Sequence, residues 1–146
     1  MTTKDKLFLH RAVLIDTPVW LKYFRKEEPA FQMVNALMDT GRVCCLDLVV
    51  AELLANAEDE KEMGVFQDFT RVFPVLRESS GVWVEAARLA FQLRQKKRSL
   101  SLRDCYVAVM ARAHGVLLYT TNRALPKACR VVPVGVRFFP EPEGSK

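Results

Sequence analysis

The sequence predicts an α/β protein, a three-layer α/β/α sandwich around a central, mainly parallel sheet. Short apolar runs such as Val13–Ile15 alternate along the chain with longer segments of helical periodicity. Strands that alternate with helices form parallel sheets covered on both faces. Half of the 146 residues are hydrophobic and 27% are charged, which suits one domain with a substantial core. We therefore expect a single domain over 1–146, with its core at about 13–139, a short N-terminal segment and a tail at 140–146.

In the first half of the chain, start and stop signals separate the expected elements. Asp16-Thr17-Pro18 supplies a cap and a proline suited to the first helical position, and Thr40-Gly41 ends a later apolar stripe. Asp47 is expected to cap the helix that follows it. The expected elements are a strand at 13–15, a helix from 17, a helix at 29–38, a strand at 43–46, a helix at 48–57 and a helix through 63–69.

In the second half, Pro74 is expected to end the preceding helix, and Ser79-Ser80-Gly81 to start a new one. Ser101 can cap the next helix, which Gly115 terminates. Pro133 and Gly135 interrupt the C-terminal segment, which is typical of edge strands. The expected elements are a strand at 72–76, a helix through 83–93, a helix from 101 to about 114, a strand at 116–120 and one or two edge strands within 131–139.

Composition also bounds the compartment and the partner. No apolar run approaches the eighteen or so residues of a membrane helix, and the four cysteines include no C-x-x-C pair. We therefore expect a cytoplasmic protein with buried, reduced thiols and no membrane association. The formal net charge of +5 favours a polyanionic partner such as a nucleic acid.

The most informative residues are isolated acids placed where apolar segments meet turns or helix starts. They are Asp16, Glu52 and Asp104, with Asn122 as a possible fourth member. Singly, each acid has an ordinary interpretation. Asp16 could be a helix cap, Glu52 part of a solvated helix face and Asp104 part of a capping box. Together they lie at element ends of one predicted sheet, where ligands bind. Buried carboxylates need a cation, and Mg²⁺ or Mn²⁺ prefers such oxygen ligands.

Other catalytic constellations are missing from the sequence. There is no phosphate-binding G-x-x-x-x-G-K-[ST] or G-x-G-x-x-G loop and no G-x-S-x-G nucleophile elbow. His10 and His114 lack the neighbours of a catalytic triad or a zinc site. A phosphoacceptor receiver domain would need an early acidic pair and a lysine after a late strand, and neither is found. The acids therefore remain the best candidate site.

Four short motifs resemble those of PIN domains, in the same order and over about 13–132. They are Leu14-Ile15-Asp16-Thr17-Pro18-Val19-Trp20, Val50-Ala51-Glu52-Leu53-Leu54, Ser101-Leu102-Arg103-Asp104-Cys105-Tyr106-Val107-Ala108 and Leu117-Leu118-Tyr119-Thr120-Thr121-Asn122. The compact length and the first motif look most like VapC toxins of toxin–antitoxin pairs. This resemblance implies a PIN-like fold, a Mg²⁺- or Mn²⁺-dependent ribonuclease, an RNA substrate, a VapB-type antitoxin and a homodimer.

The resemblance also implies roles for individual residues. Asp16, Glu52 and Asp104 would be catalytic metal ligands, Asn122 a weaker ligand, and Thr17 and Thr120 supporting residues. The last motif of the family often carries an acid, whereas Asn122 and the following Arg123-Ala124-Leu125-Pro126 supply none. Two alternatives follow, namely a PIN nuclease that processes RNA without being a toxin, and a non-catalytic PIN module that binds RNA or protein.

Two further groups are candidates for interactions. A basic run just before the third motif could follow an RNA backbone, although cations also suit a solvated helix end. It consists of Arg94, Lys96, Lys97 and Arg98. Trp20, Tyr23 and Phe24 share a helix face, where burial in the core or in a dimer interface is favoured over base stacking.

Overall fold

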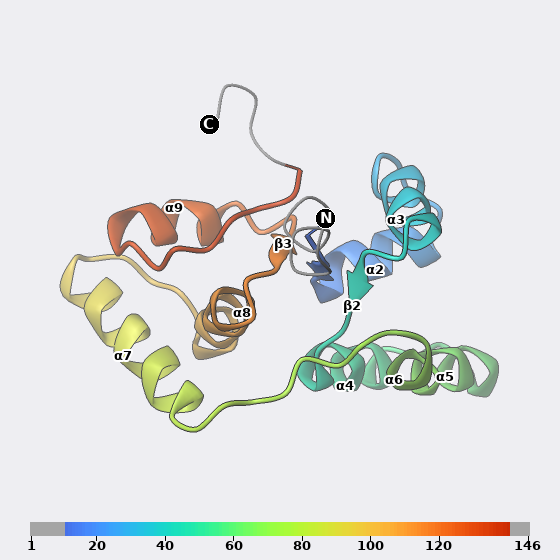
Figure 1. Cartoon of the computed structure of the whole chain (residues 1–146), viewed down its shortest axis with the longest axis horizontal. Coiled ribbons are helices and arrows are strands. Elements are labelled where there is room, and N and C mark those ends of the chain that lie inside the picture. Colours follow the sequence, from blue (N-terminus) through green and yellow to red (C-terminus); the bar gives the residue numbers. More distant parts are fainter. Residues whose placement is uncertain (1–10, 141–146) are drawn as a thin grey trace, which may run out of the picture.

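The computed structural model describes residues 11–140, which form an α/β protein around a small parallel sheet (Figure 1). Its strands are β1 (Val13–Ile15), β2 (Val43–Cys44) and β3 (Leu117–Tyr119), in the order β2-β1-β3. Val13 pairs with Val43 on one side and with Leu117 on the other, and both ladders are parallel. Every residue of β1 is fully buried, as expected for a central strand covered on both faces.

Helices cover both faces of this sheet, which confirms the expected three layers. In Figure 1, α7, α8 and α9 lie on one side of the strands, and α2 to α6 lie on the other. The helices are α2 (Thr17–Phe24), α3 (Ala30–Asp39), α4 (Asp47–Ala55), α5 (Glu60–Gln67), α6 (Phe69–Val72), α7 (Val82–Gln95), α8 (Leu102–Ala113) and α9 (Ala124–Val131).

Helix α8 is the most deeply placed helix, because it contacts both β3 and α7. Its residues 105–111 are all buried, including Val107, Ala108 and Met110, none of which has any exposed surface. A helix that is apolar on nearly all sides belongs inside the protein. Burial of this helix holds its first turn, which carries Asp104, next to the ends of the strands.

The segment 72–76 differs from the expected strand. Val72 is the last residue of α6, and of the five residues only Val75 forms a strand-like bridge, parallel to Cys45. The Cys45 N–H donates a hydrogen bond to the Pro74 carbonyl at 2.8 Å, and the Cys45 carbonyl accepts one from the Leu76 N–H at 2.9 Å. Short β-branched runs do not distinguish a strand from a helix end by periodicity. Strand β2 is also shorter than expected, ending at Cys44.

The C-terminal segment differs more, because α9 was not expected. Pro126 is the third residue of α9. An N–H group at this position has no carbonyl partner within the helix, so proline costs no hydrogen bond there. Of the expected edge strands, only Phe138 forms a bridge, parallel to Leu118, while Val131 ends α9. The tail beyond Pro140 lies outside the described residues.

Two smaller expectations about helix ends were also wrong. Asp47 is the first residue of α4 and does not cap it; Leu46 occupies the cap position, without a side-chain hydrogen bond. The helix ends at Ala55, two residues earlier than expected, and Asn56 occupies its C-cap position. Ser101 does cap α8, since its hydroxyl accepts a hydrogen bond from the Asp104 N–H at 3.1 Å.

The aromatic residues after the first motif pack inside the protein. Trp20 is only 1% exposed, and its ring lies 4.7 Å from that of Phe69 and 5.8 Å from that of Phe73. Tyr23 and Phe24 are partly buried against the same core. Trp20 is therefore a core residue of its own chain and contributes no surface to a dimer interface.

The cysteines are free and in apolar surroundings. Burial raises the pKa of Cys44 to about 12 and those of Cys45, Cys105 and Cys129 to about 11, so the thiols are neutral at physiological pH. Within residues 11–140, no helix is long and apolar enough to cross a membrane.

Candidate metal centre

The candidate site lies at the carboxyl ends of β1 and β3, where Asp16 and Thr120 follow their strands. Asp16 is 1% exposed and extends the sheet by one hydrogen bond, from its N–H to the Tyr119 carbonyl at 2.9 Å. Its Oδ1 accepts from the Thr17 N–H and its Oδ2 from the Thr120 hydroxyl, each at 2.9 Å. These bonds fix the orientation of the Asp16 carboxylate.

Helix α4 brings Glu52 to the same place. The Thr17 hydroxyl, at the start of α2, donates a hydrogen bond to Glu52 Oε1 at 2.6 Å. The Glu52 side chain is 33% exposed, so it faces solvent on one side and Thr17 on the other. Although 36 residues separate Asp16 from Glu52 (52 − 16), the packing of α2 against α4 makes them neighbours.

The first turn of α8 completes the group. Asp104 Oδ2 accepts a hydrogen bond from the Asn122 side-chain amide at 3.0 Å. The Asn122 N–H donates in turn to the Thr120 hydroxyl oxygen at 3.1 Å. The structure therefore brings together all six residues proposed for the site from the sequence: Asp16, Thr17, Glu52, Asp104, Thr120 and Asn122.

A seventh residue, Arg103, lies at the centre of this group and was not predicted. Its Nη2 donates to Asp16 Oδ1 at 2.7 Å and to Glu52 Oε1 at 2.5 Å. Its Nε donates to Glu52 Oε2 at 3.1 Å, and its Nη1 to Asp104 Oδ1 at 3.0 Å. One guanidinium group thus pairs with all three carboxylates, and its Nη2 also contacts the Thr17 hydroxyl at 3.1 Å.

These contacts set the electrostatics of the site. Burial raises the pKa of Glu52, but hydrogen bonds from Arg103 and Thr17 outweigh it and hold that pKa below its ordinary value. Burial likewise opposes the charge of Arg103, yet its bonds to Glu52 and Asp16 raise its pKa above the ordinary value. Arg103 thus supplies the charge that compensates the Glu52 carboxylate.

The donor set fits a hard divalent cation. Three carboxylates and the Thr17 hydroxyl converge, and Mg²⁺ and Mn²⁺ prefer such oxygen ligands. The Asn122 amide oxygen is not among them, because it accepts a hydrogen bond from the Ala124 N–H at 3.0 Å. With Arg103 among these oxygens, however, no group of three or more acidic, histidine or cysteine side chains within residues 11–140 is arranged to hold a metal ion. The chemistry of the site therefore suits a metal, while its geometry is set by the guanidinium.

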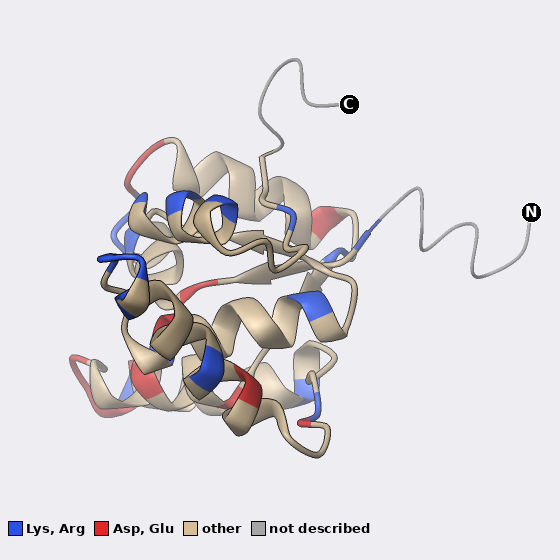
Figure 2. Cartoon of the chain, turned by 90° about the vertical axis from the view of Figure 1, so that its left-hand side faces the viewer, with Lys and Arg blue, Asp and Glu red and all other residues tan. Residues whose placement is uncertain are grey.

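The basic run occupies the end of α7 and the turn after it, a few residues before Ser101. Arg94, Lys96, Lys97 and Arg98 are all exposed, and the Arg94 guanidinium lies over the Phe91 ring, 5.7 Å from its centroid. Figure 2 shows basic positions on α7, the turn after it and α9, on the side that faces the viewer. The turn leads to the first turn of α8, so the basic run lies a few residues before Asp104 along the chain.

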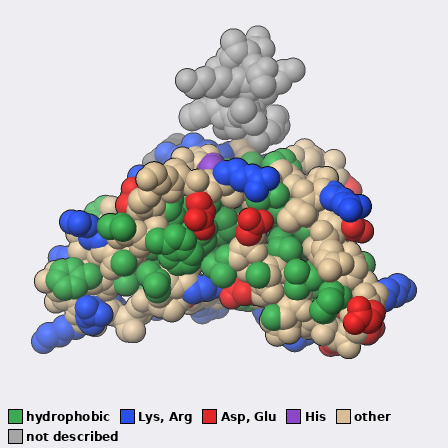
Figure 3. Space-filling model, turned by 90° about the horizontal axis from the view of Figure 1, so that it is seen from below, with side chains coloured by type: hydrophobic (Ala, Val, Ile, Leu, Met, Phe, Trp, Pro, Cys, Tyr) green, Lys and Arg blue, Asp and Glu red, His purple; other side chains and the backbone are tan. Residues whose placement is uncertain are grey.

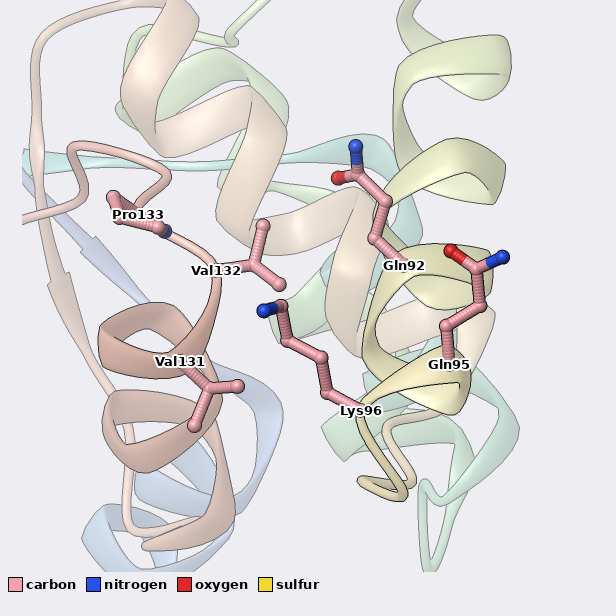
Figure 4. A pocket seen from close by; sticks show the side chains of 6 residues that line it. All are labelled: Gln92, Gln95, Lys96, Val131, Val132 and Pro133. Atoms are coloured by element: carbon pink, nitrogen blue, oxygen red, sulfur yellow. The ribbon is translucent and has the colours of Figure 1, made fainter.

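A pocket of about 420 Å³ lies between the ends of α7 and α9 (Figure 4). Its lining includes Lys96 but none of the site residues. The lining residues are Gln92, Gln95, Lys96, Val131, Val132 and Pro133. Its only charged lining residue is Lys96, so the pocket offers no carboxylate oxygens for a metal ion.

Sequence reasoning missed Arg103 for a physical reason. It stands next to Asp104 in the first turn of α8, where an exposed arginine needs no explanation. One signal was available, since a single arginine adjoins one of the isolated acids that must find a cation. Only the folded chain shows that its long side chain reaches Asp16, 87 residues away in sequence.

Comparison with known proteins agrees with this fold. The chain resembles a chain of the DNA-bound VapBC structure from Salmonella typhimurium. The TM-score is 0.67 and the sequence identity 21%, and the match covers 87% of this chain and 96% of that one. For VapBC2 from Rickettsia felis, bound to a promoter DNA fragment, the TM-score is 0.65, the identity 17% and the coverage 86% and 96%. For FitAcB from Neisseria gonorrhoeae the TM-score is 0.63 and the identity 20%, with coverage of 87% of this chain and 96% of that one.

No curated protein sequence is similar enough to the chain to count as a relative. The family model of the PIN domain, in contrast, matches residues 13–131, which include every residue of the candidate site. This match confirms the resemblance seen in the four sequence motifs. The chain therefore belongs to the PIN-domain family.

Proposed function

We propose that this protein is an endoribonuclease that depends on Mg²⁺ or Mn²⁺. The observation that carries the proposal is the convergence of Asp16, Glu52 and Asp104 at the carboxyl ends of two parallel strands, in a PIN domain. Acids gathered from separate elements of the chain repel one another unless a cation lies among them, and oxygen ligands of this kind suit a divalent ion. The net charge of +5 favours an anionic substrate.

The residues of the chain would share the work as follows. Asp16 is the most rigidly held ligand, because Thr17 and Thr120 fix both of its oxygens. Thr17 orients Glu52 through its hydroxyl, and Asn122 orients Asp104 through its amide. When bound, a divalent ion would lower the pKa of a coordinated water and neutralise charge on the phosphoryl group. The protein positions the oxygens that hold such an ion.

The basic run is the proposed contact to the RNA backbone. Lys96, Lys97 and Arg98 are exposed, and within residues 11–140 the structure records no ion pair for any of them. Replacing all three is expected to weaken RNA binding and to reduce the salt-dependence slope of log K by ~2, at about 0.7 per phosphate contact. Cleavage of RNA already bound should be largely retained.

We further propose that the protein is the toxin of a VapBC-type pair. Three of its structural neighbours are chains of VapBC or FitAcB structures, and most of their length is matched. Large hydrophobic side chains are also exposed on α7 and α8, including Trp83 (45%), Phe91 (49%) and Leu102 (47%). Figure 3 shows hydrophobic side chains gathered on the face seen from below, which suits a protein partner such as an antitoxin. A homodimer remains part of this proposal.

The test is cleavage of single-stranded RNA by purified protein with and without Mn²⁺. We expect metal-dependent cleavage that Asp16→Asn abolishes while the circular dichroism spectrum is unchanged. Glu85→Gln is the matched control, because Glu85 is an exposed acid that pairs with Arg112 away from the site. If wild-type protein binds RNA without cutting it and Asn122→Asp does cut, the protein is a non-catalytic RNA-binding PIN module.

A second test separates a toxin from an RNA-processing nuclease. Expression of the wild-type chain should arrest bacterial growth, and Asp16→Asn should not. Co-expression of the product of a small adjacent reading frame should restore growth. Metal-dependent cleavage without growth arrest would favour the processing enzyme.

A further inference from the structure

The candidate site contains its own cation. Arg103 makes ion pairs with Asp16, Glu52 and Asp104 at 2.7, 2.5 and 3.0 Å. Its Nη2 also contacts the hydroxyl of Thr17. The guanidinium therefore uses an oxygen of every carboxylate that we propose as a metal ligand.

A guanidinium at the centre of these carboxylates and a divalent ion would compete for the same position among their oxygens. Mg²⁺ requires its ligands at about 2.1 Å in octahedral geometry, which places neighbouring ligand oxygens about 3 Å apart around one point. Arg103 instead arranges the carboxylates around a planar group, with Nη2 bonded to Asp16 and Glu52, Nε to Glu52 and Nη1 to Asp104. Entry of the ion therefore requires that the guanidinium leave.

The structure provides a route for that departure. The Arg103 side chain is 25% exposed, so it borders solvent even while it is paired. Its backbone lies in the first turn of α8, where Ser101 caps the helix independently of the side chain. A change of side-chain rotamer can thus move the guanidinium into solvent without unfolding the helix.

We propose that Arg103 is a built-in competitor of the metal ion. In the metal-free protein it neutralises the three carboxylates and holds the site together, and a divalent ion binds only when it displaces the guanidinium. This inference rests on the proposed metal-dependent function, because it concerns the same carboxylates. It identifies Arg103 as the residue that sets the metal affinity of the site.

The consequence is a weakened apparent affinity for metal. The apparent Kd equals the intrinsic Kd divided by the fraction of molecules in which the site is open. If Arg103 is paired in about nine-tenths of the molecules, removing it should tighten metal binding about tenfold. A greater occupancy of the paired state would give a larger change.

Isothermal titration of metal-free protein with Mn²⁺ tests this directly, without any activity measurement. We expect Arg103→Met to bind Mn²⁺ at least ~10-fold more tightly than wild type. Arg112→Met is the matched control, because it removes an arginine from the same helix whose partner, Glu85, lies outside the site. This control should bind Mn²⁺ as wild type does.

A second measurement needs no variant and therefore does not depend on the folding of Arg103→Met. The Nε–H resonance of Arg103 in wild-type protein should shift during titration with Mg²⁺ and saturate with the same Kd as metal binding. An Nε–H resonance that stays fixed while Mg²⁺ saturates the protein would overturn the proposal. Equal Mn²⁺ affinity of wild type and a folded Arg103→Met would also overturn it.

The two proposals fail in different ways. If wild type binds Mn²⁺ and cuts RNA but Arg103→Met binds no more tightly, only the competition is refuted. If neither protein binds Mn²⁺ and neither cuts RNA, the metal-dependent nuclease is refuted together with the competition.

Discussion

The contact between Arg103 and Glu52 can be measured by a double-mutant cycle on metal-free protein. Two hydrogen bonds join them, Nη2 to Oε1 at 2.5 Å and Nε to Oε2 at 3.1 Å. Opposite charges about 4 Å apart attract by about 4 kcal/mol at an effective dielectric constant of 20. Because a third of the Glu52 side chain is exposed, solvent screening reduces the expected coupling to about 1–2 kcal/mol.

The assay is urea unfolding in the presence of EDTA for wild type, Arg103→Met, Glu52→Gln and the double variant. Each single variant should lower the free energy of unfolding, and Arg103→Met should lower it more, because it leaves three carboxylates without their shared cation. The double variant should be more stable than the sum of the two losses predicts, by about 1–2 kcal/mol.

The exposed pair between Arg112 and Glu85 provides the control cycle. Its side chains are 40% and 54% exposed, so its coupling should be smaller, about 0.2–1 kcal/mol. A coupling between Arg103 and Glu52 within about 0.3 kcal/mol of zero would refute the reasoning, because that is the value for independent sites.

Three other outcomes are expected. A hundredfold excess of Mn²⁺ over its Kd should stabilise the protein by about 2.7 kcal/mol, or about 5–10 °C in Tm, and Asp104→Asn should remove most of this shift in a thermal scan. Since the pKa of Glu52 is lowered by folding, its stabilisation is present above pH ~4.5 and lost as pH falls through the folded value. The stability difference between wild type and Glu52→Gln in urea should therefore shrink at low pH; a constant difference would contradict this. Light scattering should show a dimer at micromolar concentration, and a 16.7 kDa monomer would count against it.

The sequence alone determined the features that depend on neighbouring residues. Val13–Ile15 is a strand and Thr17 begins a helix because an apolar β-branched run meets a cap residue and a proline. Ser101 and Gly115 bound α8 through a side-chain cap and a left-handed glycine at φ 64°. The same local logic placed Asp16 at the end of a strand and Asp104 in a helix start, which made both residues site candidates.

Local signals were ambiguous in other segments. Val72 ends a helix and Val75 forms only a bridge, although both belong to an apolar run typical of strands. No helix was expected at 124–131, yet α9 forms there with Pro126 in its first turn, where a proline is tolerated. The outcome in both segments depended on packing against the rest of the core, which no short window of sequence contains.

Only the tertiary structure decided what compensates the acids. The sequence showed that Asp16, Glu52 and Asp104 need a cation, and it favoured a metal ion. The fold instead places the Arg103 guanidinium among them, because the burial of α8 brings its first turn against the ends of β1 and β3. Charge pairing acts through space over a few ångströms, and residues 87 positions apart come that close only when the chain is folded.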